Sequence, residues 1–187
     1  MIQTDRLHLV PFTREHYDAI SANDNETLGS LLNIRTPSSW TEFADAVDAL
    51  PVLISFFEKL NGDHRWGSYF IIHPVDRQLI GTGGYKGAPD EEGVVEIGYE
   101  VKEMYRNRGF ATESASALIS FAKSQAGIKA VRAHTLPREN HSVKVLQKCG
   151  MEFKGSVTDP DDGEVWRWEL QNPVKPNEKR CSNCRTS

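Results

Sequence analysis

A strand-like run, a basic turn and a helix-like run follow one another between Val94 and Ala122, and this succession constrains the fold more than any other feature. Along residues 94–101 apolar and polar side chains alternate, which is the pattern of a strand with one buried face. From Thr112 onward apolar or small residues recur at helical spacing instead: Ala115, Leu118, Ile119 and Ala122. The chain therefore has to turn within residues 102–111 and lay a helix across a sheet.

The turn between these runs carries two arginines and a glycine, in the order Arg106, Asn107, Arg108, Gly109, Phe110 and Ala111. The first N–H groups of a helix lack intrahelical acceptors and carry partial positive charge, so an anion is stabilised there. Gly109 lets the backbone approach an oxygen closely, and the two arginines add full charges, while Ala111 keeps the helix entrance uncrowded. The pattern predicts a phosphate-binding turn. A solvated loop is the alternative that so short a motif leaves open.

Several segments together resemble the GNAT superfamily of acetyl-CoA-dependent N-acetyltransferases. They read T-D-R-L-H-L-V-P-F at 4–12, E-I-G-Y-E-V at 96–101, R-N-R-G-F-A-T-E at 106–113 and L-P-R-E-N-H-S-V-K-V-L-Q-K-C-G-M at 136–151. The chain is most similar to the branch that contains the Rim-type ribosomal-protein N-terminal acetyltransferases. The resemblance extends from Thr4 to Leu170, and its most specific parts are R-x-x-G-x-A and N-x-S-x-x-V-L-x-K-x-G.

The resemblance implies an α+β fold with a mixed, mostly antiparallel central sheet and helices on both faces. Two splayed strands would form the notch for acetyl-CoA, with its pyrophosphate on the amides of residues 106–111 and on Thr112, and its pantetheine arm beside Val101. A backbone amide near Val101 would polarise the thioester carbonyl. In this family the residue at Asn140 commonly hydrogen-bonds the pantetheine arm, and capping the next helix is a second, compatible role.

The reaction that the resemblance implies is direct attack of an amine on the thioester. Glu96, on the polar face of its strand, is the leading candidate for the general base, directly or through water, because an amine arrives protonated near neutral pH. Its alternative role is a surface carboxylate or salt-bridge partner. Glu100 is the second choice, since it lies nearer the cofactor end.

The leaving thiolate has a candidate partner in Ser142, which matches the serine that Rim-type relatives present to the thiol; helix capping is its alternative role. Many relatives carry a tyrosine on this helix, whereas residues 145–148 here read V-L-Q-K. Protonation by solvent is also compatible with a thiol pKa of about 8.5. A non-catalytic acyl-CoA-binding module therefore remains the alternative function, and generic nucleotide binding is a third.

The amine acceptor is less constrained, and both a protein N-terminus and a small-molecule amine fit. Aromatic residues could line an acceptor pocket or belong to the core: Trp40, Phe43, Phe56, Phe57, His64 and Trp66. The acidic loop of Asp90, Glu91 and Glu92 could attract a cationic amine or simply be solvated. A broad groove would suit a peptide, and a closed aromatic and acidic cup would suit a polyamine, an amino acid or an amine-bearing drug.

The composition fits one domain over residues 1–172: of 187 residues, 39% are hydrophobic and 26% charged. No apolar run approaches the roughly 20 residues that span a bilayer, and a signal peptide is not evident, so we expect a cytoplasmic protein without membrane contact. A net charge of −4 argues against a dedicated nucleic-acid binder. We expect acetyl-CoA and an amine as partners and leave a homodimer open.

The tail from residue 173 to 187 is polar and almost free of apolar side chains, which predicts a flexible segment. Cys181 and Cys184 form half of a zinc-type motif, but the nearby sequence supplies no second pair and no histidine, so we expect no metal; a site shared within a dimer is the alternative. Cys149 is expected to pack as a small apolar residue.

Hydrophobic patterning also predicts the remaining elements. Strands are expected over residues 7–10, 67–72, 79–86, 94–101, 130–135, 152–157 and 164–170, and helices from Arg14 and over 41–50, 52–60 and 140–148. Pro51 is expected to separate two of these helices, and Gly83-Gly84 to mark a β-bulge.

Overall fold

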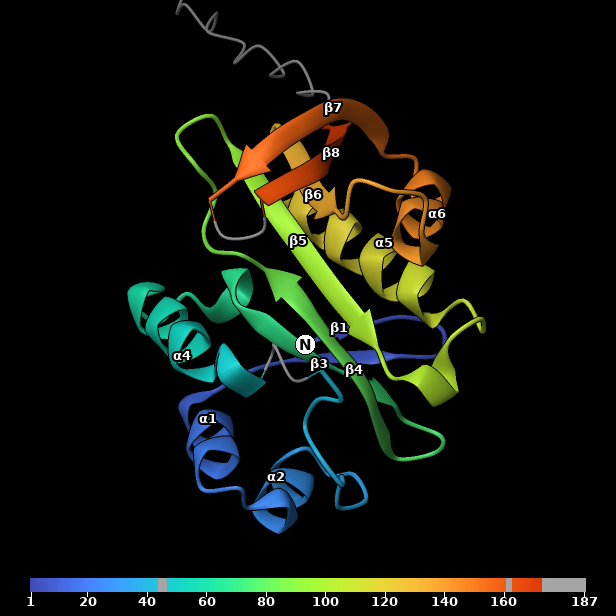
Figure 1. The fold of residues 1–187 in the computed structure, drawn as a ribbon. Coiled ribbons are helices and arrows are strands. Elements are labelled where there is room, and N and C mark those ends of the chain that lie inside the picture. Colours follow the sequence, from blue (N-terminus) through green and yellow to red (C-terminus); the bar gives the residue numbers. More distant parts are fainter. Residues whose placement is uncertain (44–46, 161–162, 173–187) are drawn as a thin grey trace, which may run out of the picture.

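Eight strands form one sheet in the computed structural model, which describes residues 1–43, 47–160 and 163–172 (Figure 1). The strands are β1 (Ile2–Gln3), β2 (His8–Pro11), β3 (Ser68–His73), β4 (Gln78–Tyr85), β5 (Val94–Val101), β6 (Ala130–Thr135), β7 (Glu152–Asp159) and β8 (Gly163–Gln171). Their order in the sheet is β1-β2-β3-β4-β5-β6-β8-β7. Every neighbouring pair is antiparallel except β5 and β6, which are parallel. The predicted mixed, mostly antiparallel α+β fold is confirmed.

Helices cover both faces of this sheet (Figure 1). They are α1 (Arg14–Ser21), α2 (Asn25–Leu31), α4 (Leu50–Lys59), α5 (Phe110–Ser124) and α6 (His141–Lys148), with short 3₁₀ turns at His64–Trp66 and Glu103–Tyr105. Alternation along β3 explains the two layers, because Ile71 packs in one buried cluster with α5 and α6, whereas Phe70 packs in a second cluster with α1 and α2.

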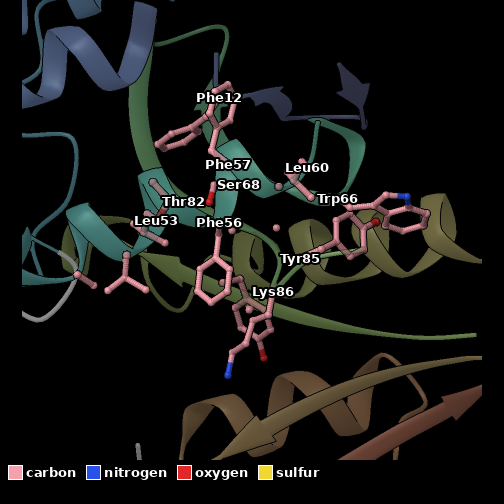
Figure 2. A pocket seen from close by; sticks show the side chains of 18 of the residues that line it. Phe12, Leu53, Phe56, Phe57, Leu60, Trp66, Ser68, Thr82, Tyr85 and Lys86 are labelled. Atoms are coloured by element: carbon pink, nitrogen blue, oxygen red, sulfur yellow. The ribbon is translucent and has the colours of Figure 1, made fainter. Parts of the chain in front are cut away.

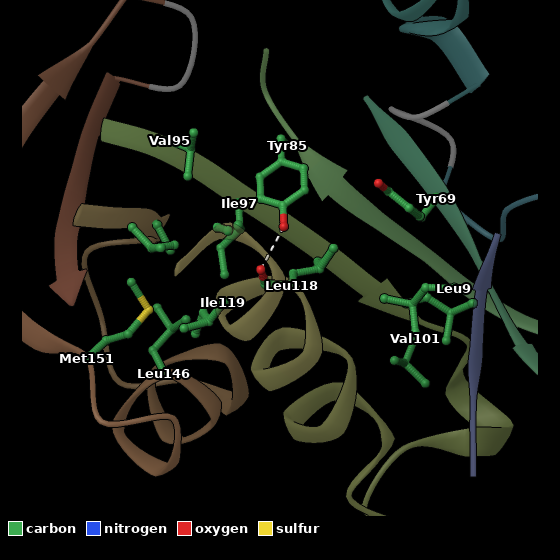
Figure 3. Close-up of a cluster of buried hydrophobic side chains, with 14 of the residues drawn as sticks. Leu9, Tyr69, Tyr85, Val95, Ile97, Val101, Leu118, Ile119, Leu146 and Met151 are labelled. Carbon is green, nitrogen blue, oxygen red and sulfur yellow. Dashed lines mark hydrogen bonds between the residues drawn. The ribbon is translucent and has the colours of Figure 1, made fainter. Parts of the chain in front are cut away.

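The core beneath β5 is built as its alternating pattern predicts (Figure 3). Val95 and Ile97 of β5 are almost fully buried against Leu118 and Ile119 of α5. Tyr85 of β4 brings a phenol into this apolar layer, and its hydroxyl donates a 2.6 Å hydrogen bond to the backbone oxygen of Leu118. Because a buried hydroxyl without a partner is costly, this bond fixes α5 relative to β4.

Three local predictions are wrong or incomplete. Of the helix predicted over 41–50, Thr41 to Phe43 are not helical, residues 44–46 lie outside the described part, and Val47 and Asp48 are helical. The helix predicted to begin after Pro51 begins at Leu50. Proline is accommodated in a first helical turn, where its missing N–H would have no acceptor anyway. The predicted bulge lies elsewhere: the register of β3 and β4 shifts at Ile80, and Gly84 instead allows a close approach to the oxygen of Gly67.

Two elements were not predicted, the short β1 and α2. The second has a clear signal in the sequence, since Asp24 caps it by accepting from the N–H of Thr27 at 2.9 Å. Within the described ranges, no helix is both long enough and apolar enough to cross a bilayer. The predicted flexible tail, with Cys181 and Cys184, lies outside the described residues, so that interpretation and the single-domain boundary at residue 172 stay predictions.

Candidate active site

The predicted phosphate-binding turn has the backbone geometry that such a site requires. Gly109 is the residue before α5 and has φ +82°, and Asn107 has φ +59°, so both adopt the left-handed conformation that glycine and asparagine tolerate best. The N–H of Glu113 donates to the oxygen of Gly109 at 3.0 Å and closes the first turn. The preceding N–H groups, those of Phe110, Ala111 and Thr112, therefore point out of the helix start, where an anion can accept from them.

A clamp from the N-terminal segment holds this turn in place. Arg6 donates to the oxygen of Arg108 at 3.0 Å and to Glu113 Oε2 at 2.7 Å, and its guanidinium lies 4.6 Å from the centre of the Phe110 ring. Thr4 Oγ1 also donates to Glu113, at 2.5 Å. Burial raises the pKa of the Glu113 carboxyl, but the hydrogen bonds from Thr4 and Arg6 outweigh it and leave the pKa lowered. Thr4, Arg6 and Glu113 lie in segments that carry the resemblance, but no role was predicted for any of them from the sequence.

Glu113→Gln is expected to lower the free energy of unfolding by about 1 kcal/mol near neutral pH, because it removes a charge-assisted hydrogen-bonding partner. Glu113 has a lowered pKa, so its contribution is present above the pKa of an unfolded glutamate and is lost as the pH falls through the folded value. Thermal unfolding at neutral and acidic pH measures this difference. Glu152→Gln is the matched control, since Glu152 forms a 2.7 Å ion pair with Lys154 on the exposed surface. Equal stability of the Glu113 variant and the wild type at neutral pH would contradict the clamp.

The side chains of the two arginines of the turn have different surroundings. Arg106 donates through Nε to the oxygen of Val101 at 3.2 Å, which ties the turn to the end of β5. The guanidinium of Arg108 lies over the rings of Tyr105 and Phe110, at 5.5 and 5.1 Å from their centres. Neither arginine is paired with a carboxylate among the described residues, so both charges remain available to an anion.

Beside this turn, β5 separates from β6. Their parallel pairing covers only three residue pairs, which end at Glu96 and Arg132. On its other side β5 stays paired with β4, where Lys86 N donates to Glu96 O at 2.9 Å and Lys102 N to Ile80 O at 2.8 Å. Because backbone groups alternate in direction along a strand, the N–H and C=O groups of Ile97, Tyr99 and Val101 face the side from which β6 has diverged. The predicted splayed strand pair is therefore present.

Helix α6 lies next to this divergence and begins at the predicted cap. Asn140 Oδ1 accepts from the N–H of Val143 at 3.0 Å, and Nδ2 donates to the oxygen of Arg138 at 3.0 Å. The capping role of Asn140 is confirmed, and one amide hydrogen remains for a ligand. The Ser142 hydroxyl makes no hydrogen bond to any described residue, so its alternative capping role is not observed.

Tyr99 is a residue that sequence reasoning placed only on a buried face. Its hydroxyl donates to the backbone oxygen of Ser142 at 3.4 Å, so its ring reaches from β5 to α6. Burial raises the pKa of this phenol, which therefore stays protonated. Leu146, within the stretch 145–148 where the resemblance led us to look for a tyrosine, is buried in the core. Tyr99 therefore sets the distance between the strand and the helix that carries Ser142.

The two candidate carboxylates on the opposite face of β5 have different environments. Glu96 Oε1 lies 2.7 Å from Lys86 Nζ and 3.0 Å from His134 Nδ1. Burial raises its pKa, but these partners outweigh burial and leave the pKa lowered. Glu100 Oε1 accepts from the hydroxyls of Thr41 and Thr82, at 2.8 and 2.9 Å. Burial dominates there and raises the pKa of Glu100 above its usual range.

A cavity of about 430 Å³ opens over the face of β4 and β5 that carries Glu100 (Figure 2). Its walls come from these strands, from α4 and from the segments around α1, and eight of the 21 lining residues are aromatic: Phe12, Tyr17, Trp40, Phe56, Phe57, Trp66, Tyr85 and Tyr99. Glu100 and Thr82 belong to its floor, and Glu96 is not part of the lining. The cavity has the size and the character of a small-ligand site.

Of the six aromatic residues proposed for an acceptor pocket, Trp40, Trp66, Phe56 and Phe57 line this cavity. The other two lie outside the lining: the Arg106 guanidinium is 5.7 Å from the Phe43 ring, and His64 stacks on Phe57 with ring centres 4.4 Å apart.

The acidic loop and the cysteine have structural roles. Asp90 Oδ1 accepts from the N–H groups of Glu92 and Val94, at 3.0 and 2.8 Å, so it closes the turn before β5 and does not line the cavity. Cys149 packs beside the core, with Sγ 3.4 Å from the hydroxyl of Ser116. The described residues include no group of three or more His, Cys, Asp or Glu side chains placed to hold a metal ion.

Comparisons with known proteins agree with this geometry. A sequence model of the family described as acetyltransferase (GNAT) domain matches residues 6–152. A curated relative, the uncharacterized N-acetyltransferase YjdG of Bacillus subtilis, is 29% identical over 150 residues, which are 80% of this chain and 88% of the relative.

Many solved structures have a similar fold, including two acetyltransferases. RimL, a ribosomal L7/L12 alpha-N-protein acetyltransferase in complex with coenzyme A, aligns with a TM-score of 0.64 at 13% identity and covers 90% of this chain and 95% of its own. A GNAT-family acetyltransferase from Bacillus anthracis aligns with a TM-score of 0.60 at 17% identity and covers 91% and 98%. At such identities the likeness shows the fold alone.

Proposed function

The chain belongs to the GNAT family of acetyltransferases, and on this premise we propose that it transfers the acetyl group of acetyl-CoA to a primary amine by direct attack. The observation that supports the proposal is that a candidate site for the donor and a candidate site for the acceptor adjoin along β5. The phosphate-binding turn and the divergence from β6 lie along one edge of the strand, and the cavity with Glu100 lies over one of its faces. A thioester beside the strand and an amine in the cavity would meet there.

The donor is held by charge and by backbone groups. The N–H of Arg106 donates to the oxygen of Glu103 at 3.0 Å, so of the predicted turn the N–H groups of residues 107–111, with Thr112, are left for the pyrophosphate. Arg106 and Arg108 supply positive charge. The pantetheine arm lies along the free backbone edge of β5 beside Val101, and the remaining amide hydrogen of Asn140 donates to it. A backbone N–H of Tyr99 or Val101 donates to the thioester oxygen and stabilises the negative charge that develops on it.

The transfer itself needs an unprotonated amine. We propose that Glu100, the second choice from the sequence, accepts the proton of the amine, because it lines the cavity and its raised pKa brings it closer to neutral pH. The amine nitrogen then attacks the carbonyl carbon, so that the C–N bond forms and the C–S bond breaks, and the nitrogen loses its second proton to water as the amide forms. Glu96 stays the alternative base, acting through water, although its pairing with Lys86 and His134 favours a fixed ionised state.

The thiolate of coenzyme A leaves on the side of α6. The Ser142 hydroxyl, held near β5 by the contact of Tyr99 with the Ser142 backbone, donates a hydrogen bond to it. A free thiol has a pKa of about 8.5, so the thiolate can take its proton from solvent. The buried Leu146 in place of a tyrosine is the observation that keeps the second function, a non-catalytic acyl-CoA-binding module, under consideration.

The test is an acceptor screen. Purified protein is incubated with acetyl-CoA and a library of small amines and N-terminal peptides, and free thiol is measured. We expect thiol release that depends on the amine. Tight binding of acetyl-CoA without turnover on any acceptor would support the acyl-CoA-binding module instead. Stronger protection against heat by ATP than by coenzyme A would support generic nucleotide binding.

A further inference from the structure

The lining of the cavity over β4 and β5 indicates the size, charge and polarity of the acceptor, which membership of the family does not determine. Resting on the proposed function, we infer that the acceptor is a small amine with a single cationic nitrogen and a bulky apolar side group, of the arylalkylamine class. A polyamine and a peptide N-terminus fit the same cavity less well.

The apolar side group is inferred from the walls. Phe12, Tyr17 and Trp40 come from the region around α1 and the segment before α4, whereas Phe56 and Phe57 come from α4 itself. Phe12 and Tyr17 are each 2% exposed and back the cavity from the core, with the Tyr17 ring centre 5.0 Å from that of Phe57. The apolar surface within reach of a ligand comes mainly from α4, where Val52 and Phe56 are 53% and 45% exposed. An aromatic or branched ligand buries its apolar area against such a surface, and a polar ligand loses hydration there without compensation.

The single cation is inferred from the charges. Among the described residues that line the cavity, Glu100 is the only acid and Lys86 the only base. Lys86 lies at the rim, and its amine points away from the rings of Phe12 and Phe57 (Figure 2). It is also paired with Glu96 at 2.7 Å. One ammonium group can be balanced by Glu100, but a second one on the same ligand would be buried against aromatic walls without a carboxylate.

The small size is inferred from the volume and from the backbone around it. The cavity volume of about 430 Å³ lies toward the lower end of small-ligand pockets. A peptide that binds by strand addition needs an unpaired sheet edge along its path. Along the floor, β4 is paired with β3 on one side and with β5 on the other, so it has no free edge to offer.

Gly98 keeps the floor open between the amine and the thioester. It lies on β5 between Glu96 and Glu100, on the cavity face, and a Cβ built there would meet no atom of the described chain within 4 Å apart from its own neighbours. Its backbone is not in the left-handed region, so a larger residue is tolerated. Gly98→Leu therefore fills the cavity without straining the strand.

The experiment compares acceptors at saturating acetyl-CoA: 2-phenylethylamine, spermidine and a short peptide with a free N-terminus. We expect kcat/KM for 2-phenylethylamine to exceed the other two by roughly tenfold to a hundredfold, the range expected from burying one apolar ring. Gly98→Leu should reduce this value by roughly tenfold or more and leave the Kd of acetyl-CoA unchanged. Phe56→Glu, at a side chain that is 45% exposed, should shift the preference toward spermidine.

The outcomes separate the inference from the proposed function. Fastest turnover of spermidine or of the peptide by the wild-type protein would overturn the arylalkylamine class and leave the acetyltransferase activity standing. Equal turnover of 2-phenylethylamine by the wild type and Gly98→Leu would overturn the cavity as its site. Binding of acetyl-CoA with no turnover of any amine would overturn the proposed function, and the inference with it.

Discussion

Gly109→Val is expected to weaken the binding of acetyl-CoA by roughly tenfold to a hundredfold. Gly109 has φ +82°, a conformation that a β-branched residue strongly disfavours, and a Cβ there would lie 3.3 Å from Arg6 Nη2. The new side chain would also keep a phosphate away from the N–H groups at the start of α5. Loss of one charge-assisted hydrogen bond, worth about 1.5–3 kcal/mol, already accounts for this range. Isothermal titration with coenzyme A measures the effect.

Gly127→Val is the matched control for backbone strain. Gly127 lies beyond the other end of α5 with φ +85°, and a Cβ there would meet no described atom within 4 Å. Both variants should lose a similar part of their thermal stability, because the left-handed conformation costs a residue with a Cβ about 1–2 kcal/mol. Only Gly109→Val should lose affinity. The same affinity in Gly109→Val and the wild type would exclude the turn as the pyrophosphate site.

Glu100→Gln is expected to reduce kcat/KM by roughly a hundredfold to ten thousandfold, the usual contribution of a general base, with the Kd of acetyl-CoA unchanged. Glutamine keeps the size of the side chain and can still hydrogen-bond Thr41 and Thr82. In the wild type, kcat/KM should fall as the pH drops through the raised pKa of Glu100, above the range of an ordinary glutamate. Rate measurements over a pH series check both points, and full activity of the variant would exclude Glu100 as the base.

Stability separates this loss from misfolding. Because the folded pKa of Glu100 is raised, its stabilising contribution is present below the pKa of an unfolded glutamate and is lost as the pH rises through the folded value. At neutral pH the ionised carboxylate therefore costs stability, and Glu100→Gln should unfold at the same or a higher temperature than the wild type.

Glu96→Gln is the comparison within the same strand. The pKa of Glu96 is lowered, so its effect on stability depends on pH in the opposite direction to that of Glu100. The stability that Glu96 contributes is present above the pKa of an unfolded glutamate and is lost as the pH falls through the folded pKa. If Glu100 is the base, Glu96→Gln should lose less activity than Glu100→Gln and keep the same fall in activity at low pH. A larger loss of activity in Glu96→Gln than in Glu100→Gln would instead identify Glu96 as the general base.

Local patterns in the sequence were sufficient for the scaffold of the proposed donor site. The alternation along β5, the glycine at the start of α5 and the asparagine before α6 each act within a few residues, so their conformations follow from nearby sequence. Pro51 illustrates the limit of such reasoning. On local grounds a proline can end one helix or begin the next, and here Pro51 lies in the first turn of α4, which begins at Leu50.

The acceptor side depends on contacts between distant segments, which patterns along one strand do not encode. Glu96 and Glu100 alternate identically on β5, and only the loop that brings Thr41 over Glu100 and the strand that brings His134 to Glu96 distinguish them. The Arg6–Glu113 clamp joins residues more than a hundred positions apart. The partners that set the pKa difference between the two carboxylates, Lys86 and His134 beside Glu96 against the hydroxyls beside Glu100, likewise come together only when the chain is folded.

Transfer of an isotopically labelled acetyl group tests the central proposal most directly. The protein is incubated with acetyl-CoA labelled in the acetyl group and with the best acceptor of the screen, and the amine is recovered for mass spectrometry while free coenzyme A is measured. We expect the label on the amine nitrogen, with one coenzyme A released for each acetylated amine. Release of coenzyme A without a labelled amine, or bound and unchanged acetyl-CoA, would contradict the proposal.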